Sequence, residues 1–397
     1  MKPSPSSSLD AQPHVVASTP EVPVSPGAAS NRLAALDWMR GLVMVLMLLD
    51  HASGAFNAGR VRSDGALVWR PGSELPVDQF LTRWVTHLCA PTFLFLAGAA
   101  LALSIHKRLR AGEAPRGLDG FHLRRGLFIA LVDPLWMSWV FLEPGSILLQ
   151  VMFALGLSMV CMVPLRRLGS RTLLGLGLTL LVGSEALLAL VSTVGQPTPP
   201  LVAMLLGLGF YEQGRFILGY PLLPWLGMMC LGWVFGRSLV DASDKALQRL
   251  VLWGVAALGV FVLVRGLNGY GNSLLYRDDG SLVQWLHVSK YPPSLAYSSL
   301  ELGLMALLLA GFWWVEARWG QVKVLAPLRV LGQTALFFYL LHVHLLEGAA
   351  AALGVKKQLG LGATYLAMVA ALAVLYPACA WYQRYKAAHP HGWTRYV

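Results

Sequence analysis

Long apolar segments recur along the chain, and polar residues gather between them. Ten such segments are about 20 residues long, the length that a helix needs to cross a bilayer. They lie at residues 34–56, 80–104, 121–142, 146–165, 171–194, 218–238, 248–267, 294–315, 328–351 and 359–382. Only the sequence EPGS at 143–146 separates the third segment from the fourth. The pattern predicts an all-α polytopic integral membrane protein with about ten transmembrane helices.

The composition supports this fold class. Hydrophobic residues make up 56% of the chain and charged residues 13%, against roughly 45–50% and about 25% in soluble domains. The formal net charge of +11 is typical of nucleic-acid-binding proteins, but here the basic residues are spread over loops between apolar segments. We therefore expect no nucleic acid partner.

Basic residues alternate from loop to loop. Six Lys and Arg residues lie in 106–125, and Arg166, Arg167 and Arg171 crowd another connection. By the positive-inside rule these loops are cytoplasmic, which places both termini in the cytoplasm. Residues 57–79 break the pattern with three arginines, partly offset by three acids. A loop that contributes to a functional site would need such residues.

The chain ends differ from the apolar body. Residues 1–31 are rich in Pro, Ser and Ala and lack the apolar core of a signal peptide, so they are expected to form a disordered cytoplasmic tail. Residues 32–385 form the predicted transmembrane domain, and 386–397 a short cytoplasmic tail. The four cysteines lie in apolar segments without CxxC spacing, and no histidine pair has metal-binding spacing on one helix face. We expect neither a disulfide framework nor a metal site.

The first span carries four ionisable residues. Asp37 and Arg40 are three positions apart and can pair on a helix. Arg40 and His51 are eleven apart, which is three helical turns, so their side chains share a face about 16 Å apart along the axis. Asp50 precedes His51. Ionisable residues inside a span are costly and suggest function, although Asp37 and Arg40 at a membrane boundary can also simply snorkel.

Further polar residues converge on the level of His51, in the predicted outer half of the membrane. His87 lies near the outer end of the second span, and Tyr291 precedes the eighth. The ninth contributes Tyr339, His342, His344 and Glu347. His342 and His344 are two positions apart, so only one can face a given pocket. A single membrane histidine is more often a hydrogen-bonded packing residue than a catalyst, and that alternative applies to His87 and His344.

Several segments together carry a family resemblance. They are RLAALDWMRGLVMVLMLLDHASGAF, THLCAPTFLFLAGAALALS, YPLLPWLGMMCLGWVFGR, KYPPSLAYSSLELG and LGQTALFFYLLHVHLL. In this order the chain, over roughly residues 32–385, resembles the bacterial branch of the heparan-alpha-glucosaminide N-acetyltransferase catalytic-domain family. That family belongs with transmembrane acyltransferases that share an Arg, ten residues, His signature in the first span.

The resemblance implies acyl transfer from cytosolic acyl-CoA, here acetyl-CoA, to an extracytoplasmic acceptor such as a sugar or glycan, in a bacterial inner membrane. Arg40 and His51 take the places of the signature residues. The chain departs from the family's lysosomal enzyme, in which an asparagine matches His51. The catalytic histidine of that enzyme follows in the next loop, where this sequence has Arg60 and Arg62.

These observations assign roles to eleven residues. We expect His51, His87 and Asp50 to be catalytic. Acyl-CoA binding is expected from Arg40, Asp37, Arg124 and Arg125, and a substrate pocket from Tyr339, His342, Glu347 and Tyr291. An imidazole is suited to activate an acceptor at neutral pH, and arginines suit the CoA phosphates. Partners would be membrane lipid, acyl-CoA and the acceptor, with a homodimer as a further option.

The competing interpretation is a transporter or permease, in which the same groups form a proton relay or a substrate path. No internal repeat is evident in the sequence, which weakens transporter folds built from two related halves. Binding of acyl-CoA distinguishes the two classes, because a permease has no need of it.

Overall fold

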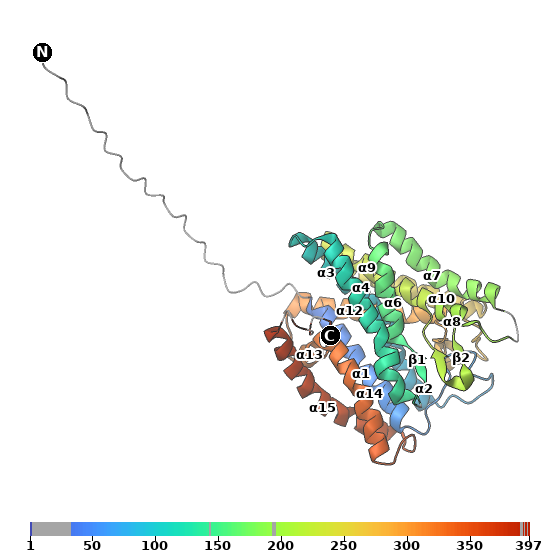
Figure 1. The fold of residues 1–397 in the computed structure, drawn as a ribbon. Helices are drawn as coiled ribbons and strands as arrows, with labels where there is room; N and C mark the ends of the chain where they lie inside the picture. The colour runs from blue at the N-terminus through green and yellow to red at the C-terminus, as the bar shows by residue number, and fades with distance from the viewer. Residues whose placement is uncertain (2–32, 143, 193–195, 390–391, 393, 395) are drawn as a thin grey trace. The chain divides into compact units, whose positions relative to one another are not determined.

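The structure, a computed structural model, describes residues 1, 33–142, 144–192, 196–389, 392, 394 and 396–397. Of the tail predicted at 1–31, all but residue 1 lies outside this set. Residues Ala34–Val397 form one unit, and helices make up most of it (Figure 1). The α-helices are α1 (Ala34–Phe56), α2 (Val77–Trp84), α3 (Cys89–Arg110), α4 (Pro115–Val132), α5 (Ser138–Phe141), α6 (Val151–Leu165), α7 (Ser170–Val191), α8 (Pro200–Leu206), α9 (Leu222–Asp241), α10 (Ala246–Leu267), α11 (Leu282–Leu286), α12 (Leu295–Trp319), α13 (Ala326–Gln333), α14 (Ala335–Ala352) and α15 (Leu361–Ala388).

Eight helical segments of the described chain are long and apolar enough to cross a membrane. They are Ala34–Phe56, Val77–Arg110, Ser170–Val191, Leu222–Asp241, Ser243–Leu267, Leu295–Trp319, Ala335–Ala352 and Leu361–Ala388. Each overlaps one of the ten predicted spans, and residue 194, the predicted end of the fifth, lies outside the described residues. The all-α, polytopic membrane class is therefore confirmed.

The two remaining predicted spans are also helical but fall short in length or apolarity. The span predicted at 121–142 comprises α4, a π-helical turn at Asp133–Met137 and α5, and α4 carries Arg124 and Arg125. The span predicted at 146–165 contains the 15-residue helix α6. Figure 1 shows α4 and α6 side by side. The Asp133 carboxylate accepts hydrogen bonds from the backbone N–H groups of Gln150 and Phe153, both at 2.8 Å, and so satisfies the start of α6.

Three short strands form a sheet that the sequence pattern did not predict. They are β1 (Ile147–Leu149), β2 (Gly209–Tyr211) and β3 (Phe216–Leu218), in the order β1-β3-β2. β1 runs parallel to β3, and β2 runs antiparallel to it. Strands of three residues are too short to show alternation in the sequence. The sheet fixes the chain just before Gln150, Val151 and Tyr220, which belong to the functional site.

Small residues allow the central helices to pack closely. A Cβ atom on Gly98 of α3 would lie 2.1 Å from the Met229 carbonyl oxygen of α9, and one on Gly232 of α9 would lie 1.9 Å from the Phe95 carbonyl oxygen of α3. Close backbone approach of this kind is the usual way in which membrane helices associate. Substitution at either glycine would therefore separate α3 from α9.

The first helix is anchored at its start by a distant carboxylate. Both oxygens of Glu316 in α12 accept hydrogen bonds from α1, from Ala34 N at 2.7 Å and Ala35 N at 2.8 Å. A carboxylate satisfies free N–H groups and complements the helix dipole. The start of α1 is thus fixed next to the end of α12.

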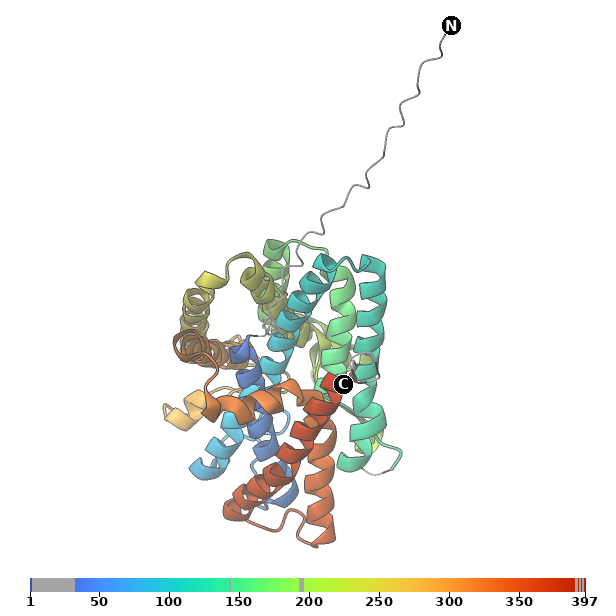
Figure 2. The ribbon, with the colours of Figure 1, turned by 90° about the vertical axis from the view of Figure 1, so that its left-hand side faces the viewer.

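The last two predicted spans differ slightly from the structure. The span predicted at 328–351 is divided at Thr334 into α13 and α14. Figure 2 shows α14 and α15 running side by side. α15 continues to Ala388, so the boundary at 385 falls inside the helix. The Tyr396 ring lies 5.5 Å from the Phe121 ring of α4, and the chain end therefore packs against the bundle.

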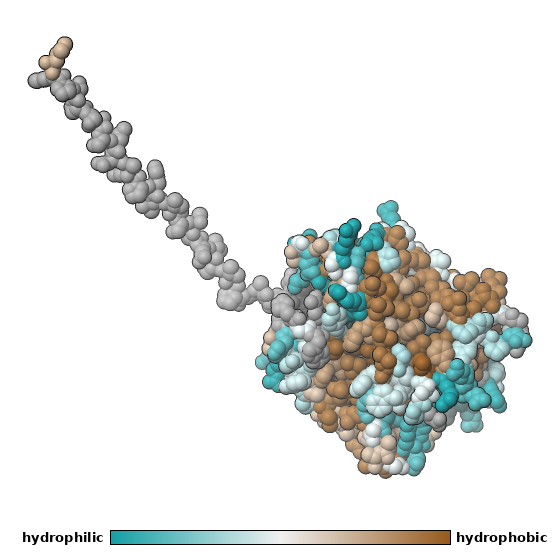
Figure 3. Space-filling view, viewed as in Figure 1, coloured by the Kyte–Doolittle hydropathy of each residue, from teal (hydrophilic) through white to brown (hydrophobic). Residues whose placement is uncertain are grey.

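Apolar side chains gather in a band on the face seen in Figure 3, with polar side chains above and below it. Exposed apolar residues include Leu190 of α7, Leu263 of α10 and Leu366 of α15. Such exposure suits a lipid-facing surface. The basic α3–α4 connection lies at one end of the unit, and the loops after α1 and α14 lie at the other (Figure 1). Which end is cytoplasmic stays a prediction from the loop charges.

Candidate functional site

A cavity of about 420 Å³ lies at the end of α1, in the half of the molecule opposite the basic connections. α1 contributes Met47, Asp50, His51 and Gly54 to its lining. The remaining wall comes from the loop after α1, α2 and the turn that follows it, the start of α3, the end of α5, the start of α6, the segments before α9 and α12, and α14 with the loop after it. A volume of this size accommodates a small-molecule substrate.

His51 pairs with a second histidine at the cavity wall. Its Nδ1 lies 2.6 Å from Nε2 of His342 in α14, and the two rings stack with centroids 4.8 Å apart. Phe141 of α5 meets the His51 ring edge-on at 5.7 Å. His51 is half-buried and lines the cavity, whereas His342 is fully buried behind it.

The backbone of α14 fixes which nitrogens of this pair carry protons. Nδ1 of His342 lies 2.8 Å from the Tyr339 carbonyl oxygen and 3.2 Å from that of Phe338. Carbonyl oxygens only accept, so His342 Nδ1–H donates, and in the neutral ring Nε2 is left as an acceptor. His51 Nδ1–H then donates to His342 Nε2. The remaining His51 nitrogen, Nε2, carries a lone pair and has no hydrogen-bond partner among the described residues.

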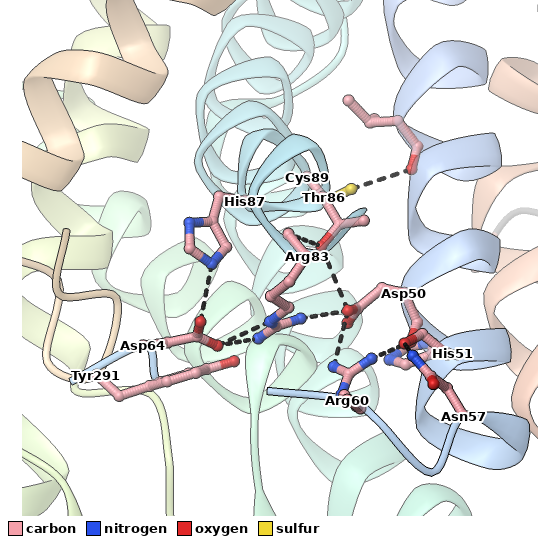
Figure 4. Close-up of polar contacts among 12 residues, drawn as sticks. Asp50, His51, Asn57, Arg60, Asp64, Arg83, Thr86, His87, Cys89 and Tyr291 are labelled. Carbon is pink, nitrogen blue, oxygen red and sulfur yellow. Dashed lines mark hydrogen bonds and ion pairs between the residues drawn. The ribbon is translucent and has the colours of Figure 1, made fainter. Parts of the chain in front are cut away.

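A chain of charged groups lies beside His51 (Figure 4). Asp50 accepts from Arg60 at 2.8 Å and also pairs with Arg83. Arg83 extends between two carboxylates, since its Nε donates to Asp64 at 2.8 Å and its Nη2 pairs with the same oxygen. His87 Nε2 lies 3.1 Å from the other Asp64 oxygen. α1, the loop after it and the start of the helical segment Val77–Arg110 are thereby held together around one buried guanidinium.

The charge of Asp64 is maintained by these partners. Burial alone would raise the pKa of the Asp64 carboxyl, but the adjacent Arg83 guanidinium and His87 hold that pKa well below its usual value. The backbone of Asp64 also binds the segment before α12, because its carbonyl oxygen accepts from Lys290 N at 2.8 Å and Tyr291 N at 3.0 Å. The loop 57–79 therefore contributes directly to the site.

The structure separates His87 from His51. His87 is only 3% exposed, contacts Asp64, and meets the Tyr297 ring edge-on at 5.8 Å. It is not among the residues that line the cavity. As their spacing requires, His342 and His344 face different surroundings. The centroid of the His344 ring lies 4.6 Å from that of Trp136 and 4.8 Å from that of Trp139.

The predicted pocket residues are brought together. Tyr291, Tyr339 and Glu347 line the cavity, and Glu347 pairs with Lys356 at 2.8 Å. The Tyr291 hydroxyl lies 3.4 Å from that of Tyr220, another lining residue. His342 reaches the cavity only through His51.

The expected acyl-CoA residues lie toward the start of α1. Arg40 donates to Asp37 at 3.1 Å and to the Leu96 carbonyl oxygen at 3.4 Å, which confirms the expected pairing. Arg125 of α4 lies close enough for its positive charge and that of Arg40 to repel each other, whereas Arg124 is exposed. The cavity lining on α1 begins at Met47, so it does not include Arg40.

Sequence reasoning missed Arg83, Asp64 and Lys290. Arg83 lies inside a membrane-spanning segment, and the rule that applied to Asp37 and Arg40 would have identified it. Asp64 lies in an irregular loop, where no periodicity indicates which side chains turn inward. Lys290 lies in the irregular segment before α12, where no periodicity shows that it lines the cavity and is only 4% exposed.

Comparison with known proteins gives one family. The model of the family described as heparan-alpha-glucosaminide N-acetyltransferase, catalytic, matches residues 32–264. No curated protein matches the chain. The matched region runs from α1 into α10 and contains Arg40, His51 and Arg83, whereas Tyr291, Tyr339 and His342 lie beyond it.

Proposed function

Because the chain belongs to the heparan-alpha-glucosaminide N-acetyltransferase catalytic family, a family of membrane acyltransferases, we propose that it transfers an acetyl group from cytosolic acetyl-CoA to an extracytoplasmic acceptor. The acceptor is an amine or hydroxyl of a sugar or glycan, and the membrane is a bacterial inner membrane. The observation that carries the proposal is the histidine pair at the cavity wall, which leaves His51 Nε2 as an unpaired base.

His51 acts as the general base. As the acceptor attacks the acetyl carbonyl carbon, Nε2 takes the proton that leaves the acceptor nitrogen or oxygen. The new C–N or C–O bond forms, the C–S bond to CoA breaks, and the proton passes from His51 to the departing thiolate. His342 holds the His51 ring in the tautomer that presents Nε2, as a hydrogen-bonded partner does for many functional histidines.

Two tyrosine hydroxyls and a phenyl ring complete the reacting end. Tyr291 and Tyr339 line the cavity, and a phenolic O–H can donate to the oxyanion that develops on the acetyl carbonyl. Phe141 covers one edge of His51 and limits access of water to the base. Asp50 is engaged by Arg60 and Arg83, so its role is to position the loop after α1 rather than to exchange protons.

The donor phosphates are assigned to the other end of α1. Arg40 is 22% exposed and lies beside Arg125, and an arginine fork matches phosphate geometry. Arg40 and His51 lie on one continuous helix, three turns and about 16 Å apart, a length comparable to an extended pantetheine arm. Asp37 orients Arg40, and Arg124 supplies a more distant exposed charge.

Acetyl transfer to a simple acceptor tests the proposal against the permease alternative. The full chain, reconstituted in liposomes, would be given glucosamine inside the vesicles and labelled acetyl-CoA outside, and the reverse arrangement would also be measured. We expect acetylated glucosamine and free CoA in equal amounts. Uptake of glucosamine without consumption of acetyl-CoA would contradict the proposal and indicate a permease.

A further inference from the structure

The cavity carries more positive charge than its acids neutralise. Among the described residues, six basic side chains line it, against the two carboxylates of Asp50 and Glu347. The basic residues are Arg60, Arg62, Arg83, Lys290, Lys356 and Lys357. Arg60 and Arg83 pair with Asp50, and Lys356 pairs with Glu347. In the described part of the chain, no carboxylate forms an ion pair with Arg62, Lys290 or Lys357.

Lys290 is the most enclosed of these three cations. The residue is 4% exposed, and its ammonium group lies 5.3 Å from the centre of the Tyr291 ring. The carboxyl groups of Asp50 and Glu301 are near enough for its charge to act on them, but neither forms an ion pair with it, and a buried ammonium group that forms no ion pair is costly. Its backbone N–H is bound to the Asp64 carbonyl oxygen, so the backbone position does not depend on the side chain. Arg62 and Lys357 are exposed and lie nearer the solvent.

We infer that Lys290, with Arg62 and Lys357 nearer the mouth, binds an anionic group on the acceptor. The inference rests on the proposed function and narrows its substrate class to acceptors that carry a carboxylate, sulfate or phosphate beside the reacting amine or hydroxyl. Lys290 and His51 line the same cavity, so one acceptor can present its anion to the lysine and its nucleophile to His51 Nε2. The cations also attract such an acceptor from solution.

The donor is the other molecule that could supply an anion, through the phosphates of CoA. Our assignment of those phosphates to Arg40 leaves the cavity cations for the acceptor. The two sources predict different kinetics. If Lys290 binds the anion of the acceptor, its loss raises only the KM for an anionic acceptor. If Lys290 binds CoA, its loss raises the KM for acetyl-CoA.

Two probes that share an amine but differ in charge test the inference. Binding and acetylation of glucosamine and of glucosamine 6-phosphate would be measured with the full chain in detergent. We expect the wild type to prefer the phosphorylated sugar by about tenfold or more, because charge-assisted hydrogen bonds add to affinity. Lys290→Gln should remove most of that preference and leave the KM for glucosamine and for acetyl-CoA unchanged, while Lys290→Arg should retain it.

The control is Arg70→Gln, which removes an exposed arginine of the same loop that does not line the cavity and should leave the preference intact. An equal preference in Lys290→Gln and wild type, no preference in the wild type, or a higher KM for acetyl-CoA in Lys290→Gln would each overturn the inference. Direct binding separates it from the proposed function. Lys290-dependent binding of glucosamine 6-phosphate without any acetyl transfer would support the anion site and contradict the acetyltransferase.

Discussion

The first helix carries ion-paired side chains near each of its ends, and the two sets of ion pairs form in different ways. Near its start, Arg40 pairs with Asp37, three residues earlier in the same helix. Toward its end, Asp50 pairs with Arg60 and Arg83, which are 10 and 33 residues away. The first pair follows from helical spacing alone. The second exists only because the loop 57–79 and the segment before α3 fold back onto α1.

This difference fits the proposed assignment of donor binding to the start of α1 and of acetyl transfer to its end. The Asp37–Arg40 pair lies toward the end with the basic connections and presents a positive group suited to phosphate. The Asp50 group lies on a cavity wall beside His51 and holds together the segments that form it. From the proposed function we expect substitutions near the start of α1 to change donor binding, and substitutions near its end to change transfer or stability.

The largest expected effect is on transfer by His51→Ala. Removing a general base typically lowers the rate by about 10² to 10⁴, and the phosphates of acetyl-CoA bind elsewhere. We expect that loss in kcat, with acetyl-CoA affinity and thermal stability near those of the wild type. His87→Ala should have a smaller effect, because His87 acts on the cavity only through Asp64 and Arg83. A larger loss in His87→Ala than in His51→Ala would reverse their roles.

Arg83→Leu should mainly reduce stability. It leaves Asp64 without its guanidinium partner and Asp50 with Arg60 alone, and breaking a buried ion pair costs about 3–5 kcal/mol. Thermal unfolding in detergent measures the change. Arg62→Leu, which removes an exposed arginine, is the control and should stay within about 0.5 kcal/mol. Adding Asp64→Asn to Arg83→Leu should restore part of the lost free energy of unfolding, because it removes the carboxylate left without a partner. No restoration would argue against the Arg83–Asp64 ion pair as the source of the stability.

Arg40→Ala should weaken acetyl-CoA binding. Loss of a charge-assisted contact to phosphate costs about 1.5–3 kcal/mol, or roughly tenfold to a hundredfold in Kd. Arg40→Lys should be intermediate, because a point charge replaces a fork. Arg62→Ala, at the opposite end of the molecule, should bind acetyl-CoA as the wild type does. Titration calorimetry checks all three, and equal affinities would remove Arg40 from the donor site.

His342→Leu should have an effect of the same size as Arg40→Ala, but on kcat rather than on Kd. It removes the acceptor that fixes the His51 tautomer; at metal sites, loss of the outer hydrogen-bond partner of a histidine costs about tenfold to a hundredfold in activity, and we expect a loss of that size here. His342→Gln should recover part of kcat, because a glutamine oxygen can accept from His51 Nδ1–H. The KM values should not change in either variant. Equal activity of the leucine and glutamine variants would show that His342 only fills space.

Apolar periodicity predicted most of the fold and only part of the site. The lengths of the apolar segments identified the membrane helices, because a run of about 20 apolar residues is the length that a helix needs to cross a bilayer. The π-helical turn at Asp133–Met137 and the short strands have no such signal. In the site, helical spacing predicted the Asp37–Arg40 pair and the divergence of His342 from His344. The contact between His51 and His342 joins positions 291 residues apart, which no local pattern can specify.

A structure of the chain with bound acetyl-CoA tests the central claim most directly. The distance that matters is from the acetyl carbonyl carbon to His51 Nε2. We predict that the donor extends along α1, with phosphate oxygens within hydrogen-bonding distance of Arg40 and the acetyl group inside the cavity. A bound acceptor would then fit between the acetyl group and His51 Nε2. A donor whose phosphates contact Lys290 and Arg62, or whose acetyl group lies outside the cavity, would contradict the account.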